Sequence, residues 1–293
     1  MVKLDFSKPI LMSIVNATPD SFSDDGLYRG GSRLPTPGTG GQAKSPQKRL
    51  PPDLDVSQII DIGGESTNPH SKPVNVEQEL IRILPVIDIV RHQKNKDQII
   101  SLDTYKSPVA EAALQKGVEM INFLCGEFSA PDMYEVVAKY NAYLVIYHIF
   151  GTPAGILATR QKRQARHTDV ITELLEFFTA QTRKALRAGI DPEKIIIDPG
   201  IGFGTTDQEN VEILDRLPEL AKLGYPILIG LSRKGFLGTL LQQKYQLDAK
   251  PEPQDRLEMA LELTEKAVRG GAKVIRTHDS ALTKKYLSDK GLM

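Results

Sequence analysis

Apolar residues occur in short continuous runs along the chain, and segments with a different spacing separate most of these runs. Each run has roughly four to eight residues and is rich in β-branched and aliphatic side chains, which is typical of a strand buried on both faces. Eight such runs are present, over residues 10–16, 59–63, 99–103, 119–122, 142–149, 194–198, 226–232 and 272–278. The pattern predicts a parallel sheet that is covered by helices.

Between most of these runs, apolar residues stand three and four positions apart, as they do in amphipathic helices. Helices are predicted within residues 75–92, 107–117, 131–141, 167–189 and 255–271. Pro108 and Pro131 suit the first turn of a helix, and Gly117, Gly189 and Gly271 suit a helix end.

Eight strands that alternate with helices predict a (β/α)₈ barrel, or TIM barrel, which we expect to form a single domain over residues 1–293. A doubly wound open sheet is the alternative fold. We prefer the barrel because eight strands are predicted and no Gly-x-Gly-x-x-Gly sequence follows the first strand.

The connection between the first two strands lacks a helical pattern. Residues 27–57 contain five prolines and several glycines, which disfavour a regular helix. We therefore expect an irregular, mobile loop in place of the first outer helix. The apolar sheet surface left behind would then need another element, or a partner chain, to cover it.

The composition is that of an ordinary soluble protein, with 40% hydrophobic and 25% charged residues. The 37 basic and 37 acidic residues balance, so we expect no nucleic-acid partner. No run approaches the roughly 20 apolar residues of a membrane span, and no signal-peptide pattern is present, so we infer a cytoplasmic protein. The single cysteine, Cys125, is expected to pack, and the basic run 160–167 is interpreted as a solvated loop.

Polar residues gather where the predicted strands end, and in a (β/α)₈ barrel that end carries the active site. The segments are NATPDSFSDDG, GGESTNPHSKP, DTYK, Asn122, DPGIGFGTT, SRKGF and RTHD. Each fragment alone is an ordinary turn, whereas their joint placement at one rim predicts a site. Arg276 and His278 are two residues apart on one strand, so they point the same way and suit an anion.

Taken in order, NATPDSFSDDG, DIGGESTNP, SLDTYK, Asn122, DPGIGFG, SRKGF and RTHD resemble the signature segments of dihydropteroate synthases. The resemblance implies a TIM barrel that condenses 6-hydroxymethyl-7,8-dihydropterin diphosphate with 4-aminobenzoate. The products are dihydropteroate, for folate biosynthesis, and diphosphate. It also implies Mg²⁺ as the cofactor, a homodimer, and a target for sulfonamides, which mimic 4-aminobenzoate.

The resemblance further implies that Asp103, Asn122, Asp198 and Lys234 hold the pterin ring. Carboxylates and an amide suit the donor-rich edge of a pterin. They also favour the positive charge that develops as the diphosphate leaves.

The diphosphate would be bound by Asn16, Arg276 and His278, and Asn16 would also bind magnesium through its oxygen. Asp24, in the first loop, is expected to act in catalysis together with Lys234, Arg276 and His278. The first two loops would close over the cationic intermediate and exclude water.

For 4-aminobenzoate the resemblance implies a pocket lined by Phe22, Thr67, Pro69, Phe203 and Lys234. Four positions depart from the family's pattern. Asn68 replaces an arginine, Thr205 a lysine, Gly235 a serine and Phe123 an acidic residue. We expect pterin binding to be retained and 4-aminobenzoate binding and loop closure to be altered or lost.

Two other functions remain open. The first is a catalytically weak homologue that binds a pterin without turnover. The second is a methyltetrahydrofolate-type methyltransferase, which passes a methyl group to a corrinoid protein. The pair Arg276 and His278 argues against the second, because a methyl donor without diphosphate needs no anion site.

Overall fold

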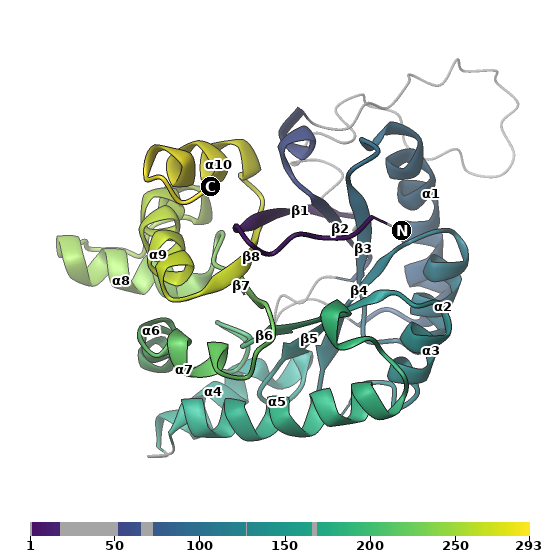
Figure 1. Cartoon of the computed structure of the whole chain (residues 1–293). Helices are drawn as coiled ribbons and strands as arrows, with labels where there is room; N and C mark the ends of the chain where they lie inside the picture. The colour runs from purple at the N-terminus through teal and green to yellow at the C-terminus, as the bar shows by residue number, and fades with distance from the viewer. Residues whose placement is uncertain (1, 18–51, 66–72, 127, 166–168) are drawn as a thin grey trace, which may run out of the picture.

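Eight parallel strands close into a barrel in which each strand pairs with its neighbours in chain order and β1 pairs with β8 (Figure 1). This computed structural model describes residues 2–17, 52–65, 73–126, 128–165 and 169–293. The strands are β1 (Ile10–Asn16), β2 (Ile59–Gly63), β3 (Ile99–Asp103), β4 (Met120–Cys125), β5 (Tyr143–His148), β6 (Ile195–Asp198), β7 (Ile227–Gly230) and β8 (Ala272–Thr277). The predicted (β/α)₈ barrel is confirmed, and a strand lies within or across each predicted run.

Helices surround the barrel. They are α1 (Val76–Gln93), α2 (Ser107–Gln115), α3 (Met133–Lys139), α4 (Ile156–Gln164), α5 (Val170–Arg187), α6 (Asp207–Asp215), α7 (Leu217–Ala221), α8 (Gly235–Tyr245), α9 (Leu257–Arg269) and α10 (Ser280–Asp289). Short 3-10 helices are η1 (Pro52–Val56), η2 (Pro153–Gly155), η3 (Pro192–Lys194) and η4 (Pro253–Arg256). The five predicted helices correspond to α1, α2, α3, α5 and α9.

The interpretation of residues 160–167 as a solvated loop was wrong, because residues 160–164 belong to α4. The residue that anchors this helix is Arg163, whose guanidinium is buried and pairs with Glu173 at 2.7 Å and Glu209 at 2.6 Å. An arginine in the buried position hides the apolar stripe by which an amphipathic helix is recognised.

The end of the connection between β1 and β2 is also more regular than predicted. Residues 52–56 of the predicted irregular segment 27–57 form η1, while residues 27–51 lie outside the described residues. Gln98 stabilises this turn, because its Nε2 donates to the carbonyl oxygens of Leu54 at 2.6 Å and Ser57 at 2.7 Å. η1 lies against α10 and β1, so η1 and α10 together cover part of the outer sheet surface at β1.

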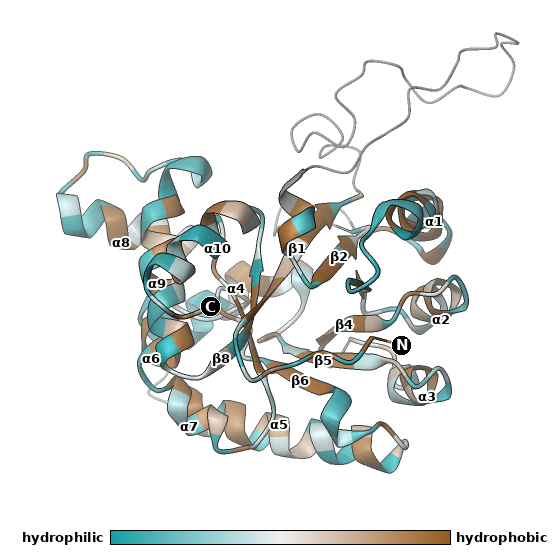
Figure 2. Cartoon of the chain, turned by 45° about the horizontal axis from the view of Figure 1, so that its top comes forward, coloured by the Kyte–Doolittle hydropathy of each residue, from teal (hydrophilic) through white to brown (hydrophobic). Residues whose placement is uncertain are grey.

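The core has two layers, and the strands are largely hydrophobic while the surrounding helices mix hydrophilic and hydrophobic residues (Figure 2). One layer lies between the strands and the helices, and the other fills the barrel. Inside the barrel, Ile59, Ile99 and Met120 are fully buried. Two residues further along the same strands, the buried interior positions are polar, with Asp61, Ser101 and Asn122. The interior therefore changes from apolar to polar toward the carboxyl ends of the strands.

Among the described residues, no helix has the length and apolar character required to cross a membrane.

Leu54→Ala tests whether η1 covers the outer sheet surface at β1. Leu54 is buried in the outer core layer, so truncation should lower the free energy of unfolding by about 2–4 kcal/mol. Urea denaturation measures this difference. Leu247→Ala, at an exposed position, is the control and should cost less than about 0.5 kcal/mol. Equal costs for the two variants would contradict a covering role for η1.

Candidate active site

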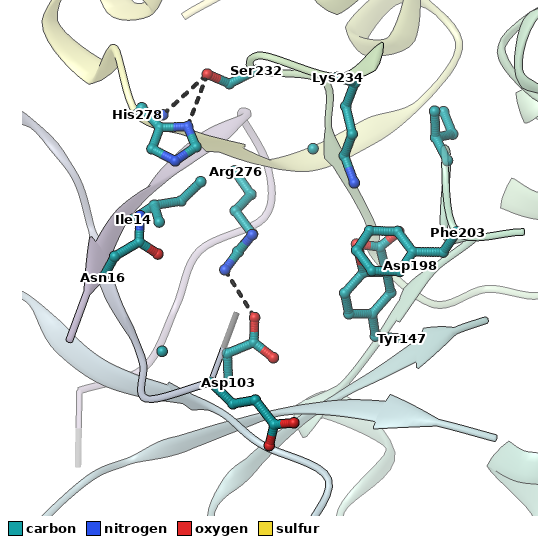
Figure 3. A pocket seen from close by; sticks show the side chains of 14 residues that line it. Ile14, Asn16, Asp103, Tyr147, Asp198, Phe203, Ser232, Lys234, Arg276 and His278 are labelled. Atoms are coloured by element: carbon teal, nitrogen blue, oxygen red, sulfur yellow. Dashed lines mark hydrogen bonds and ion pairs between the residues drawn. The ribbon is translucent and has the colours of Figure 1, made fainter. Parts of the chain in front are cut away.

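A pocket opens at the carboxyl ends of the strands, where the sequence predicted a site (Figure 3). Polar side chains line most of it, from β1, β3, β6 and β8 and from the loops that follow β2, β7 and β8. The lining side chains are Ile14, Asn16, Glu65, Asp103, Tyr147, Asp198, Ile201, Phe203, Ser232, Lys234, Arg276 and His278. Six of the residues predicted to bind or act on substrate are therefore brought together: Asn16, Asp103, Asp198, Lys234, Arg276 and His278. Phe203, predicted for 4-aminobenzoate, lies beside them.

Arg276 is held between two carboxylates. Its Nε donates to Oδ2 of Asp61 at 2.7 Å, and its Nη2 donates to Oδ2 of Asp103 at 2.9 Å. Burial raises the pKa of Asp103 to about 7, although the Arg276 guanidinium opposes the shift. Near neutral pH, Asp103 can therefore exist with or without its proton.

Lys234 and Asp198 form the second charged pair of the pocket. Burial lowers the pKa of Lys234 to about 7, against the attraction of Asp198. Burial likewise raises the pKa of Asp198 to about 6, while a hydrogen bond from the Gly200 amide at 2.8 Å favours the ionised form. The Lys234 ammonium nitrogen lies 3.9 Å from the centre of the Phe203 ring, a cation–π contact that fixes both side chains against each other.

The turn after β6 presents Phe203 to the pocket. Gly204 has φ +86°, and a Cβ there would collide with the Phe150 carbonyl oxygen, so only glycine fits this close approach. The Phe150 amide donates to the Phe203 carbonyl oxygen at 3.0 Å. The departure at Thr205 has a structural explanation, because its hydroxyl donates to Asn210 Oδ1 at 2.6 Å and closes the same turn. Thr205 is buried and is not among the described residues that line the pocket.

His278 faces the pocket as a neutral ring. Burial lowers its pKa to about 3, and the nearby Arg233 lowers it further. At this end of β8, Arg276 thus carries the charge, while His278 offers a ring nitrogen. Its Nδ1 lies 3.1 Å from the hydroxyl of Ser232, which orients the imidazole.

A second ion network lies at the rim of the pocket. Lys106 pairs with Glu65 and, at 2.6 Å, with Glu79 on α1. The hydroxyl of Tyr105 donates to Glu65 at 3.0 Å. Glu65 is the last described residue before residues 66–72. The network therefore ties this position, just after β2, to the segment that follows β3 and to α1.

Several predicted residues are not brought into the pocket. Asn122 lies beneath it, where its Nδ2 donates to Asp61 Oδ2 at 3.1 Å. Phe123 faces the outer core and packs edge-on against Tyr134 at 5.7 Å between ring centres, and Gly235 is the first residue of α8. The remaining predictions fall outside the described residues, namely Phe22, Asp24, Thr67, Asn68 and Pro69.

Sequence reasoning overlooked four residues of the site: Asp61, Glu65, Tyr147 and Ser232. A signal existed for Asp61, because a charged residue in the middle of the apolar run IIDIG is rarely buried without a partner. The other three stand at strand ends among residues that were considered.

Comparison with known proteins agrees with this geometry. A family model described as "Pterin binding enzyme" matches residues 56–278. The chain belongs to the pterin-binding enzyme family. It is 38% identical to the dihydropteroate synthase of Synechocystis sp. over 269 residues. The aligned region covers 92% of this chain and 84% of that protein.

Solved structures of dihydropteroate synthases resemble this pterin-binding enzyme over nearly its whole length. The enzyme of Clostridium difficile, in the presence of pteroic acid, is 33% identical with a TM-score of 0.75, covering 97% of this chain and 95% of that one. The enzyme of Xanthomonas albilineans, with 4-aminobenzoic acid, is 32% identical with a TM-score of 0.77, covering 98% and 94%. The predicted family is confirmed.

Lys234→Met should stabilise the ligand-free enzyme. The folded-state pKa of Lys234 is lowered to about 7 from 10.5, so below pH 7 the folded state bears the full cost of a buried charge. This cost declines as the pH rises from 7 to 10.5, because over this range Lys234 loses its proton in the folded state while it keeps the proton in the unfolded state. The gain from Lys234→Met should therefore be largest near and below pH 7 and shrink toward pH 10.5.

Urea denaturation of both proteins at pH 7 and pH 10 measures this gain. The exposed Lys96→Met serves as a control, whose effect should be the same at the two pH values. A gain from Lys234→Met that does not decrease at pH 10 would contradict the assigned cost.

Proposed function

We propose that this enzyme condenses 6-hydroxymethyl-7,8-dihydropterin diphosphate with 4-aminobenzoate and releases dihydropteroate and diphosphate in folate biosynthesis. The observation that carries the proposal is the convergence of Asp103, Asp198 and Lys234 on the same pocket as Arg276. The pocket thus combines acceptors for a pterin with a fixed cation for a phosphate. The relatives named above, which are dihydropteroate synthases, support the same reaction.

In this proposal Asp103 and Asp198 accept hydrogen bonds from the donor-rich edge of the pterin. Their raised pKa values mean that an empty pocket holds part of each carboxyl group in the protonated form near pH 7. Donors of the pterin favour the ionised form, so binding should release protons. Lys234 contacts the Phe203 ring and is attracted by Asp198, and it would contact the pterin beside these residues.

The diphosphate would lie toward β1 and β8, where Arg276 and His278 line the pocket with Asn16. Magnesium is bound in proteins through one or two oxygen ligands together with substrate phosphates and water. Asn16 supplies an amide oxygen on the pocket wall, so the donor set fits a magnesium ion that arrives with the diphosphate. When bound, the ion would neutralise charge on the leaving group.

The reaction we propose is dissociative. The bond between the pterin methylene carbon and the diphosphate oxygen breaks, and the electron pair leaves with the diphosphate. The amine nitrogen of 4-aminobenzoate then attacks the cationic methylene and loses a proton. Asp103 and Asp198 would stabilise the cation because they are carboxyl groups that line the pocket at fixed positions.

4-Aminobenzoate would approach along the Phe203 ring, beside Lys234. Phe22, Thr67 and Pro69 would complete its site, and Asp24 would act as the first loop closes. These assignments rest on the resemblance to dihydropteroate synthases. The methyltransferase alternative is less favoured, because its substrate has no diphosphate to occupy the Arg276 side of the pocket.

Purified enzyme should form dihydropteroate from the pterin diphosphate and 4-aminobenzoate in the presence of magnesium. Lys234→Ala should reduce turnover by at least about 100-fold, because it removes a group that contacts both substrates. Product formation followed by chromatography measures both rates. No turnover by the folded wild-type protein would contradict the proposal and favour a homologue that only binds a pterin.

We also propose a homodimer in the cytoplasm, which the resemblance to dihydropteroate synthases supports. Light scattering coupled to size-exclusion chromatography, at micromolar concentration, should give twice the chain mass of 32.4 kDa. A mass equal to one chain across the concentration range would contradict the dimer.

A further inference from the structure

Asp61 is a fully buried carboxylate beneath the pocket, and the reaction proposed above gives it no role. It stands in the middle of β2, opposite Ser101 of β3, and is 0% exposed. An ionised carboxylate at such a position is costly unless it is paired and hydrogen-bonded. The hydrogen-bond partners of Asp61 therefore indicate its role.

Oδ2 of Asp61 accepts two hydrogen bonds, from Arg276 Nε at 2.7 Å and from Asn122 Nδ2 at 3.1 Å. Asn122 comes from β4 and Arg276 from β8, so Asp61 links opposite parts of the barrel below the pocket. Because Nε is bonded within the planar guanidinium, a fixed Nε–H direction also fixes the plane of the whole group.

The two carboxylates that contact Arg276 differ in access to ligand. Asp103 lines the pocket, where the proposed function has it accept hydrogen bonds from the pterin. Asp61 is sealed below and does not line the pocket. A pterin can thus compete with Arg276 for Asp103, whereas the bond between Asp61 and Nε remains.

We propose that Asp61 is a positioning residue that holds Arg276 by its Nε, so that the Nη groups face the diphosphate when the pterin occupies Asp103. This inference rests on the proposed function, because it assumes that pterin and diphosphate share the pocket. In the ligand-free enzyme Nη2 contacts Asp103. Pterin binding would free this donor for a phosphate oxygen, while Asp61 keeps the guanidinium plane in place.

A structural role for Asp61 is the competing explanation, since any buried carboxylate can stabilise the arginine beside it. The two roles are separable in a double-mutant cycle with Arg276→Lys. Lysine retains the positive charge but has no Nε–H fork for Asp61 to orient. Asp61→Asn is nearly isosteric and keeps an oxygen acceptor, so it weakens the hold on Arg276 with little change in packing.

The experiment measures binding of inorganic diphosphate by titration calorimetry, with magnesium and 6-hydroxymethyl-7,8-dihydropterin present. Asp61→Asn should weaken diphosphate binding by about tenfold in the wild-type background. In the Arg276→Lys background the same substitution should change it by less than about twofold. In steady-state assays, Asp61→Asn should raise the KM for the pterin diphosphate and leave the KM for 4-aminobenzoate unchanged.

Ser101→Ala is the matched control, because Ser101 is equally buried beside Asp61 and, among the described residues, its hydroxyl has no hydrogen-bond partner. It should leave diphosphate binding unchanged. An equal effect of Asp61→Asn in both backgrounds, or the same loss in Ser101→Ala, would overturn the positioning role. Calorimetry does not require turnover, so a wild-type enzyme that binds diphosphate without forming dihydropteroate would refute the reaction and leave the role of Asp61 testable.

Discussion

Charges placed inside a closed barrel must be neutralised within the barrel, and this constraint organises the site. Side chains alternate along each parallel strand, so every second residue points inward, and near the carboxyl ends these positions carry Asp61, Asp103 and Arg276. The guanidinium lies between the two carboxylates at hydrogen-bonding distance. Removing Arg276 would leave two buried carboxylates without their cation, and removing either carboxylate would leave Arg276 with a single partner, which is why the group functions as a unit.

The same constraint recurs around the wall that carries Phe203. Arg163 is buried under the turn after β6 and stacks on the Phe150 ring at 3.6 Å. It also pairs with Glu209, whose carboxylate accepts from the Thr206 amide at 2.7 Å in the capping box of α6. A chain of charge and backbone contacts therefore connects α4, α6 and the turn that presents Phe203. Rigid support of this kind keeps a binding surface in one geometry.

A short 3-10 helix helps to cover the outer surface of the barrel at β1. Among the described residues, η1 and α10 lie over β1, and Leu54 contributes a buried apolar contact. Gln98 supplies the hydrogen bonds that a short turn cannot make internally. η1 and α10 thus support β1, whose carboxyl end carries Asn16 of the pocket.

The sequence by itself determined the eight strands, the barrel and most of the polar pocket, because continuous apolar runs and polar strand ends are local features of the chain. It missed α4, whose buried anchor is Arg163, and Asp61, whose role depends on a partner 215 residues away. It also did not reveal that burial lowers the pKa of His278 to about 3. Only the tertiary structure decided these points, because pairing and desolvation of a side chain depend on neighbours that are distant in sequence.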